Sequence, residues 1–205
     1  LSINKIKKYS IIPNVIDDKT FEYKEKTEDK RLKILSIRPY SSKKYANDIS
    51  VKTVVELSTK PYFNELSFTF YGSGALFEKT LKPIKKFHNV TIHEKFLSHK
   101  EIVEAHAEHG VMLIPTRQDA QGVSMCEAMS SGLLILTSNN TAIPEFVENS
   151  YGYLANDYLE LVKAVDELYY NPDKYLKMSE LGSIMIKKKC SPEIVIKKEI
   201  ELINS

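Results

Sequence analysis

Two short apolar runs, VMLIP (Val111–Pro115) and LLILT (Leu133–Thr137), constrain the fold of this chain more than any other feature. Neither run alternates apolar with polar residues, so each predicts a strand covered on both faces, as in parallel sheets wrapped by helices. The segment between them, VSMCEAMSSG, predicts a short helix that ends at Gly132. Together the three segments predict a strand–helix–strand unit of an α/β domain.

The same alternation extends over most of the chain. Further strands are predicted at residues 32–37, 66–71 and 89–94, and helices at 47–60, 75–87 (with a kink at Pro83) and 98–110. The last helix has a signal at each end, because Ser98 and Glu101 have capping-box spacing and Gly110 closes it. We therefore predict one Rossmann-like, doubly wound parallel sheet of about six strands.

The remaining segments set the expected domain organisation. Residues 1–31 are interpreted as an entry segment followed by a solvated, charged connector, residues 32–190 as the Rossmann-like domain, and residues 191–205 as a C-terminal helix. The sequence begins with Leu1 and not with methionine, which suggests either a fragment of a longer chain or a processed or trimmed terminus.

Composition narrows the class of protein. The 205 residues include 29 Lys plus Arg and 27 Asp plus Glu, a balance that gives no argument for nucleic acid, and no apolar run approaches the ~20 residues of a membrane span. Cys126 and Cys190 lack metal-ligand spacing and are interpreted as reduced thiols of a cytoplasmic protein. His106 and His109 are expected on a solvated helix face, so we predict no metal site.

Ligands of doubly wound sheets bind at the carboxyl ends of the strands, so the loops after the strands are the candidate sites. The loop RPYSSKK offers Arg38 and Lys43, which predict either ordinary surface charge or a cationic clamp for phosphate. The loop YGSG offers Gly72 and Gly74, for which a tight turn and a ligand contact are equally good explanations. Phe77 replaces the third glycine of the dinucleotide fingerprint, which disfavours a dehydrogenase.

The loop TRQDAQG after Pro115 is the richest of these. Gly122 opens a helix whose backbone N–H groups favour an anion, and Asp119 and Glu127 could accept hydrogen bonds from the hydroxyls of a polyol. The alternative is that Asp119 only caps the helix and Glu127 is merely exposed. Thr141 and Glu145, in the next loop, have capping-box-like spacing that explains them structurally.

These loops together resemble the C-terminal half of the retaining GT-B-fold glycosyltransferases of family 4, also called glycosyl transferases group 1. The segment IPNVID resembles the family's IPNGVD-like entry, and Arg38 and Lys43 keep the five-residue offset of its GRLxxxKG pattern, with Ile37 in place of the glycine. The segment DAQGVSMCEAMSSG resembles its EGFGxxxxEAMAxG motif, with Asp119 in place of glutamate. The resemblance covers nearly the whole chain in the same order.

The resemblance implies a role for each site residue. Arg38 and Lys43 would hold the diphosphate of a nucleotide-sugar such as a UDP-sugar, Asp119 would contact the sugar, and Glu127 the ribose. The binding set is Arg38, Lys43, Gly72, Gly74, Leu97, Asp119, Ala120, Gln121, Gly122, Val123 and Glu127, with Leu97 near the base. Arg38, Lys43 and Asp119 would also act in catalysis, stabilising the departing diphosphate without a metal or any other cofactor.

The resemblance further implies a hexosyltransferase that acts on a glycan or lipid-linked acceptor in surface polysaccharide synthesis. The acceptor would bind an N-terminal domain missing from this chain, so the chain alone is expected to be inactive. Cytoplasmic location is expected, with peripheral membrane association through the missing half as one option. A nucleotide-sugar 2-epimerase of the same fold and a noncatalytic nucleotide-sugar-binding module remain the alternatives.

Overall fold

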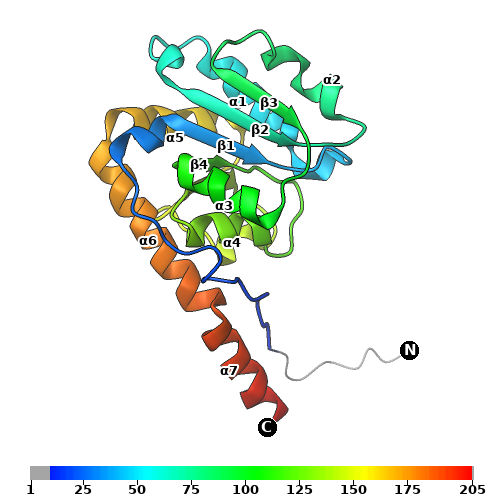
Figure 1. Ribbon diagram of the computed structural model, residues 1–205, viewed down its shortest axis with the longest axis vertical. Coiled ribbons are helices and arrows are strands. Elements are labelled where there is room, and N and C mark those ends of the chain that lie inside the picture. The colour runs from blue at the N-terminus through cyan, green and yellow to red at the C-terminus, as the bar shows by residue number, and fades with distance from the viewer. Residues whose placement is uncertain (1–9, 205) are drawn as a thin grey trace.

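Residues 10–204 are described in the computed structural model, which contains the expected sheet (Figure 1). Its strands are β1 (Lys33–Ile37), β2 (Ser67–Gly72), β3 (Val90–Glu94), β4 (Val111–Leu113), β5 (Leu134–Ser138) and β6 (Tyr153–Ala155). The strand order is β3-β2-β1-β4-β5-β6, and every neighbouring pair is parallel. This order, in which the chain reverses direction across the sheet after β3, confirms the doubly wound, Rossmann-like fold.

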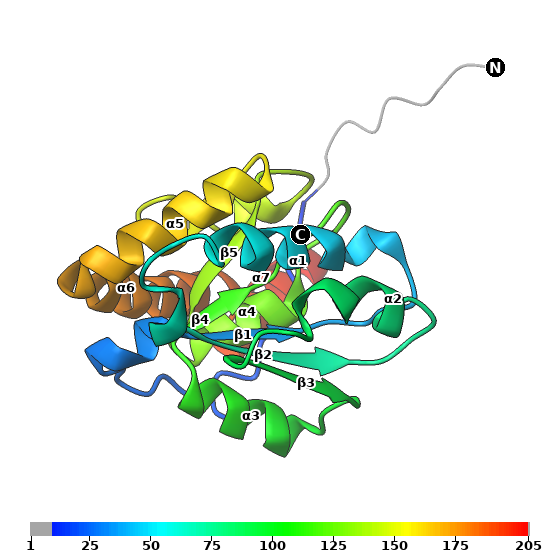
Figure 2. The ribbon, with the colours of Figure 1, turned by 90° about the horizontal axis from the view of Figure 1, so that it is seen from above.

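Helices cover both faces of the sheet (Figure 2). They are α1 (Asn47–Leu57), α2 (Phe77–Leu81), α3 (His99–Glu108), α4 (Val123–Ser130), α5 (Tyr158–Tyr170), α6 (Pro172–Cys190) and α7 (Pro192–Ile203). Neighbouring residues of one strand belong to different apolar clusters: Leu134 packs with α1 and α5, whereas Ile135 packs with α4 and the end of α6. Because side chains alternate across a strand, the continuously apolar runs supply both cores at once.

The C-terminal helix α7 projects beyond the body of the domain (Figure 1), and Val195 is its one buried residue among those described. Within residues 10–204, none of the helices combines the length and the apolar character needed to cross a membrane.

The prediction of one helix over residues 75–87 is wrong, because the helix is shorter. Helix α2 covers only Phe77–Leu81 and is followed by a 3₁₀ turn at Lys82–Ile84 that contains Pro83. Proline lacks the backbone N–H that an α-helix would need at this position, so the helix breaks and does not merely kink.

The charged connector is not solvated throughout, which corrects the second part of the entry-segment prediction. Phe21 is 3% exposed, with its ring centroid 5.8 Å from that of His106, and the Lys26 ammonium donates a 2.7 Å hydrogen bond to the His106 carbonyl. Burial lowers the pKa of Lys26 to about 8. The connector therefore fastens the N-terminal segment to α3.

The histidine face of α3 is buried, contrary to the expectation of a solvated face. The capping box of Ser98 and Glu101 is present as predicted. His106 Nδ1 lies 3.0 Å from Ser131 Oγ, and His109 Nε2 lies 2.9 Å from Thr69 Oγ1. Burial lowers the pKa of both rings, to about 3 for His106, so these histidines are core residues satisfied by hydrogen bonds.

The predicted closing role of Gly110 is also wrong, because α3 ends at Glu108 with His109 in extended conformation and Gly110 donates its N–H to Lys33 O. Gly110 therefore belongs to the connection into β4. Sequence spacing could not distinguish a helix-closing glycine from one that enters the next strand.

Candidate functional site

The candidate site lies at the carboxyl ends of β1 and β4, which pair with each other at the centre of the sheet. From β1 the chain proceeds outward to β2 and β3, and from β4 it proceeds to β5 and β6 on the other side. The loops after β1 and β4 therefore separate here, and such a topological switch point is where open α/β sheets bind ligands.

Arg38 directly follows β1 and is 5% exposed. One guanidinium nitrogen donates to Pro115 O at 3.3 Å, the guanidinium carbon lies 5.1 Å from the Tyr45 ring centroid, and the buried Nε has no hydrogen-bond partner. Burial lowers the pKa of Arg38, and the charges of Asp119 and Tyr45 oppose that effect. Arg38 forms no ion pair within the described residues, although buried charges are normally paired, so the site is arranged for an anion.

The amino end of α4 lies near this charge, because Asp119, whose charge acts on Arg38, accepts a hydrogen bond from Gly122 N. Gly122, the residue that caps α4, is in the left-handed region with φ 73°, and its carbonyl accepts the Cys126 N–H at 3.0 Å. In the described part of the chain, the N–H groups of Val123, Ser124 and Met125 have no acceptor. Open N–H groups and the positive end of the helix dipole attract anions. This confirms that Gly122 opens a helix, as the sequence predicts.

Asp119 holds the loop that leads into α4. Its Oδ1 accepts hydrogen bonds from Gly122 N at 2.7 Å and from Gln121 N at 3.3 Å. The Asp119 N–H in turn donates to Thr141 Oγ1 at 3.3 Å, and Thr141 has a positive φ of 49°. Thr141 therefore pairs with Asp119 and forms no capping box with Glu145, which corrects that prediction. Asp119 Oδ1 therefore fixes the backbone of the loop before α4, whereas Asp119 Oδ2 accepts no hydrogen bond from a described residue.

Glu127 lies one turn inside α4 and is half-buried. Burial raises the pKa of its carboxyl, and the charge of His99, the first residue of α3, lowers it. Within residues 10–204, no donor hydrogen-bonds this carboxylate. The carboxylate therefore lies near enough to the start of α3 to feel the charge of His99, and an added ligand with hydroxyls would satisfy it.

Replacing Glu127 with Gln should stabilise the free protein at neutral pH. An acid whose pKa is raised by folding costs stability as pH rises from its unfolded value, near 4.3, to its folded value, and the neutral amide escapes that loss. Thermal unfolding at pH 7 should show a higher midpoint for Glu127→Gln than for the parent, and a smaller difference at pH 4.

Glu167→Gln is the matched control with the opposite sign. Hydrogen bonds from Lys174 and Tyr153 lower the pKa of Glu167, so its charge stabilises the fold above the unfolded pKa. This variant should lose stability at pH 7. Equal midpoints for Glu127→Gln and the parent at pH 7 would show that the Glu127 carboxylate is solvated.

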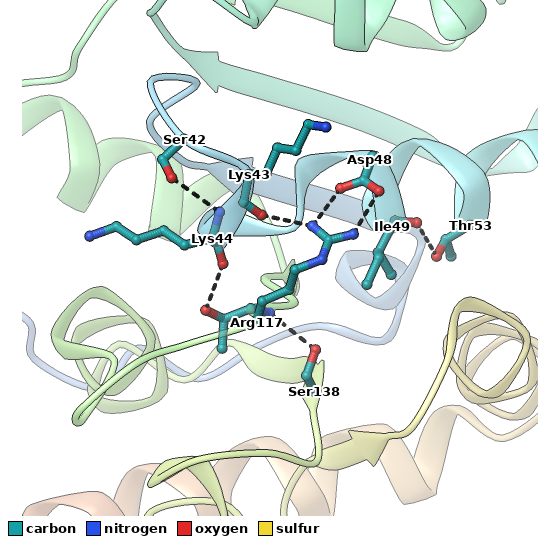
Figure 3. Close-up of polar contacts among 9 residues, drawn as sticks. Ser42, Lys43, Lys44, Asp48, Ile49, Thr53, Arg117 and Ser138 are labelled. Atoms are coloured by element: carbon teal, nitrogen blue, oxygen red, sulfur yellow. Dashed lines mark hydrogen bonds and ion pairs between the residues drawn. The ribbon is translucent and has the colours of Figure 1, made fainter.

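The turn that carries Lys43 is docked on the loop after β4 (Figure 3). Arg117 donates to Lys43 O at 2.7 Å and forms two 2.8 Å hydrogen bonds with the Asp48 carboxylate. The side chains of Lys43 and Lys44 point in different directions from this turn (Figure 3). Lys44 Nζ lies 4.9 Å from the Tyr45 ring that Arg38 also contacts. Sequence reasoning missed Arg117 and Lys44, although both stand in strand-end loops.

The remaining predicted residues divide into three groups. Gly72 and Gly74 pack against the loop after β1, where a side chain on Gly72 would come within 1.9 Å of Arg38 O. That contact accounts for glycine at this position, and a ligand role for either residue stays a prediction. The Gln121 side chain is buried against Asn14 and Cys190, so its amide is already occupied. Ala120 and Val123 are exposed beside the α4 terminus, and Leu97 is half-buried.

The two cysteines are free thiols that α4 and α6 bring together around Gln121. Cys126 Sγ lies 3.9 Å from Gln121 O, and Gln121 Nε2 lies 3.8 Å from Cys190 Sγ. The described residues bring no three His, Cys, Asp or Glu side chains into a metal-binding group.

Comparison with known families gives one match, in which the profile of the glycosyl transferases group 1 covers residues 17–184. No curated protein matches the chain by sequence.

Several solved structures share the fold. A mutant of S. aureus TarM in complex with Fondaparinux, alpha-GlcNAc-glycerol and UDP superposes with a TM-score of 0.74 at 20% identity, over 96% of this chain and 38% of its own. Sucrose-phosphate synthase from Thermosynechococcus elongatus gives 0.77 at 16% identity, over 94% of this chain and 51% of its own.

A third structure corresponds to one domain. The C-terminal domain of a glycosyl transferase group 1 family protein from Francisella tularensis gives a TM-score of 0.72 at 14% identity, over 86% of this chain and 99% of its own. This chain thus spans 38% of the TarM chain and about half of the synthase chain. It covers 99% of the isolated C-terminal domain.

Proposed function

Because the chain belongs to the glycosyl transferases group 1 family, we propose that it is the nucleotide-sugar-binding half of a retaining hexosyltransferase. Its donor would be a nucleoside-diphosphate sugar, and its acceptor a glycan or lipid-linked glycan of surface polysaccharide synthesis. The acceptor-binding half would lie outside these 205 residues. UDP is the first nucleotide to test, since the TarM mutant structure contains UDP.

The buried, unpaired Arg38 beside the open terminus of α4 is the observation that carries the proposal. Arg38 is 5% exposed, its buried Nε has no hydrogen-bond partner, and it forms no ion pair with a described residue, so its charge costs free energy until an anion binds. A diphosphate supplies several oxygens, which can accept hydrogen bonds from Arg38 and from the N–H groups of residues 123–125 at once.

The same arrangement would assist transfer. As the bond between the sugar and the diphosphate breaks through an oxocarbenium-like state, negative charge grows on the leaving diphosphate. Arg38 and the α4 dipole are held in place before reaction, Arg38 by Pro115 and α4 by Asp119, so they stabilise that charge without reorganising. Lys43 or Lys44 would add a second cation from the turn after β1.

Asp119 and Glu127 would grip the two ends of the donor. The open Oδ2 of Asp119, in the middle of the loop before α4, would accept from sugar hydroxyls, whereas Glu127, toward α3, would accept from the ribose. A nucleotide-sugar thus satisfies both carboxylates and the anion site in one ligand.

The two carboxylates should be distinguishable by ligand. Glu127→Gln should weaken UDP and UDP-sugars alike, because both contain ribose, and roughly tenfold is expected for one hydrogen bond to a charged group. Asp119→Asn should weaken only UDP-sugars, and it retains the Oδ1 that accepts the Gly122 and Gln121 N–H groups. Isothermal titration with UDP, UDP-glucose and UDP-N-acetylglucosamine gives the comparison.

Ser124→Ala is a control on the same helix, because its side chain has no assigned role and its backbone N–H is kept. It should leave all three affinities unchanged. If Asp119→Asn weakened UDP as much as the UDP-sugars, the assignment of Asp119 to the sugar would be wrong. If the parent bound none of the three ligands, UDP-based donors would be excluded.

A further inference from the structure

A second cavity lies beside the candidate donor site, between α1, α2 and the loops after β1 and β4. Its volume is about 600 Å³, and it is lined by Ser42, Lys43, Asn47, Asp48, Val51, Lys52, Leu76, Lys79, Thr80, Pro83 and Arg117. This volume lies within the range of roughly 300–1,000 Å³ typical of small-molecule sites. We call this cavity the α1–α2 groove. Of its lining residues, only Lys43 also has a role in the proposed donor site.

The groove carries an excess of positive charge. Four cations line it, Lys43, Lys52, Lys79 and Arg117, against Asp48 as the single acid of the lining. Asp48 accepts hydrogen bonds from Arg117 (Figure 3). This contact is the main cause of the lowered pKa of Asp48, and the charge of Lys52 contributes less. In the described structure, Lys43, Lys52 and Lys79 form no ion pair. Like charges gathered in one concavity repel each other and attract an anion.

The cations come from separate elements that the fold holds together. Lys43 is in the turn after β1, Lys52 in α1, Lys79 in α2 and Arg117 in the loop after β4. The Arg117 hydrogen bonds to Lys43 O and Asp48 fasten three of these elements to one another (Figure 3). Charges placed around a ligand from several sides match an anion with several oxygens, as a phosphate has.

The other residues of the lining add a second requirement. Val51, Leu76 and Pro83 give the groove an apolar floor, and Ser42 and Thr80 offer hydroxyls. Ser42 Oγ accepts the Lys44 N–H, so its hydroxyl hydrogen is free to donate. A bare inorganic ion would leave the apolar floor without contacts.

We propose that the α1–α2 groove is a binding site for a phosphate ester with a hydrocarbon portion. The phosphate contacts Lys43, Lys52, Lys79 and Arg117, and the carbon chain lies on Val51, Leu76 and Pro83. The proposal uses neither Arg38 nor the α4 terminus. Lys43 is the one residue that it shares with the donor site, and Lys52, Lys79 and Arg117 line the groove independently of that site.

The test is an NMR titration of ¹⁵N-labelled protein with hexyl phosphate, inorganic phosphate and hexanol as probes. Hexyl phosphate should shift the amides of Val51 and Leu76 and bind about tenfold more tightly than inorganic phosphate, since burying two methylenes is sufficient for that factor. Hexanol, which lacks the charge, should bind most weakly.

The double variant Lys52→Glu, Lys79→Glu should weaken hexyl phosphate by about tenfold or more, because it reverses two of the lining charges. Lys82→Glu is the matched control: Lys82 is exposed and adjoins the groove in sequence but does not line it. It should bind hexyl phosphate as the parent does. Unchanged UDP affinity in the double variant would show that the fold and the donor site are intact.

Three outcomes would overturn the proposal. They are equal hexyl phosphate affinity in the double variant and the parent, amide shifts centred on Gly122 and Val123 with none in the groove, and hexanol binding as tight as hexyl phosphate. If inorganic phosphate caused amide shifts as strong as those with hexyl phosphate, the site would not recognise the hydrocarbon portion of the ligand, and that part of the proposal would be wrong.

Discussion

Replacing Arg38 with Met should weaken UDP binding by roughly ten- to a hundredfold, because charge-assisted hydrogen bonds contribute about 1.5–3 kcal/mol. The same substitution should leave the free energy of unfolding unchanged or raise it by about 1 kcal/mol, since an unpaired buried charge is exchanged for an apolar side chain of similar length. Isothermal titration and urea unfolding of the same preparation measure the two effects. A residue that served only the fold would lose stability along with affinity.

Arg31→Met is the control for this prediction. Arg31 is a second arginine with backbone acceptors, and it donates to the carbonyls of Leu168 and Tyr169 at the far end of α5. Its loss should lower stability, because the carbonyls of Glu28, Leu168 and Tyr169 lose a donor, and should leave UDP affinity unchanged. If Arg38→Met bound UDP as tightly as the parent, Arg38 would not belong to the anion site.

Replacing Gly72 with Ala should destabilise the protein by roughly 3 kcal/mol or more, near the upper end of what overpacking costs. Gly72 has a φ of 152°, and an added Cβ would lie 1.9 Å from Arg38 O and 2.8 Å from the Tyr40 ring. The segment that carries this carbonyl is held on both sides, because the Arg38 N–H donates to Tyr71 O and the Tyr40 N–H donates to Ser73 O. Urea unfolding, or the soluble yield if the variant does not fold, measures the loss.

Gly122→Ala separates this clash from the cost of a left-handed backbone. Gly122 also has a positive φ, 73°, but the nearest atom to an added Cβ is the end of the Ile143 side chain at 3.3 Å. Only the left-handed conformation then disfavours alanine, which costs roughly 1–2 kcal/mol. If both variants lost the same free energy, the close approach of Gly72 to Arg38 would not be the constraint.

Much of the architecture could be predicted from local sequence patterns. The apolar runs at β4 and β5 require cover on both faces, and the Ser98–Glu101 spacing specifies the start of α3, because a capping box closes within one turn. Strand-end position also placed Arg38 and Gly122 at one edge of the sheet, since parallel strands all end on the same side. Each of these inferences depends on residues close together in the chain.

Other features depend on which distant residues meet. The sequence of the charged connector predicts a solvated segment. Lys26 nevertheless donates to the His106 carbonyl, 80 residues away, and Phe21 packs on the His106 ring. The same packing buries the histidine face of α3. The charged residues of these segments do not show which face a partner will cover, so their burial was decided by tertiary contacts.

The sequence by itself determined a parallel α/β sheet with a cation and a helix terminus at its carboxyl edge, because strand and helix periods are local properties. Only the tertiary structure decided that Arg38 is buried without an anion, because burial depends on Pro115 and Tyr45 from other segments. It also decided that Lys43 lines the α1–α2 groove, whereas Lys44 lies over the Tyr45 ring that Arg38 also contacts. Neighbouring side chains on a turn point in different directions, and sequence spacing does not specify these directions.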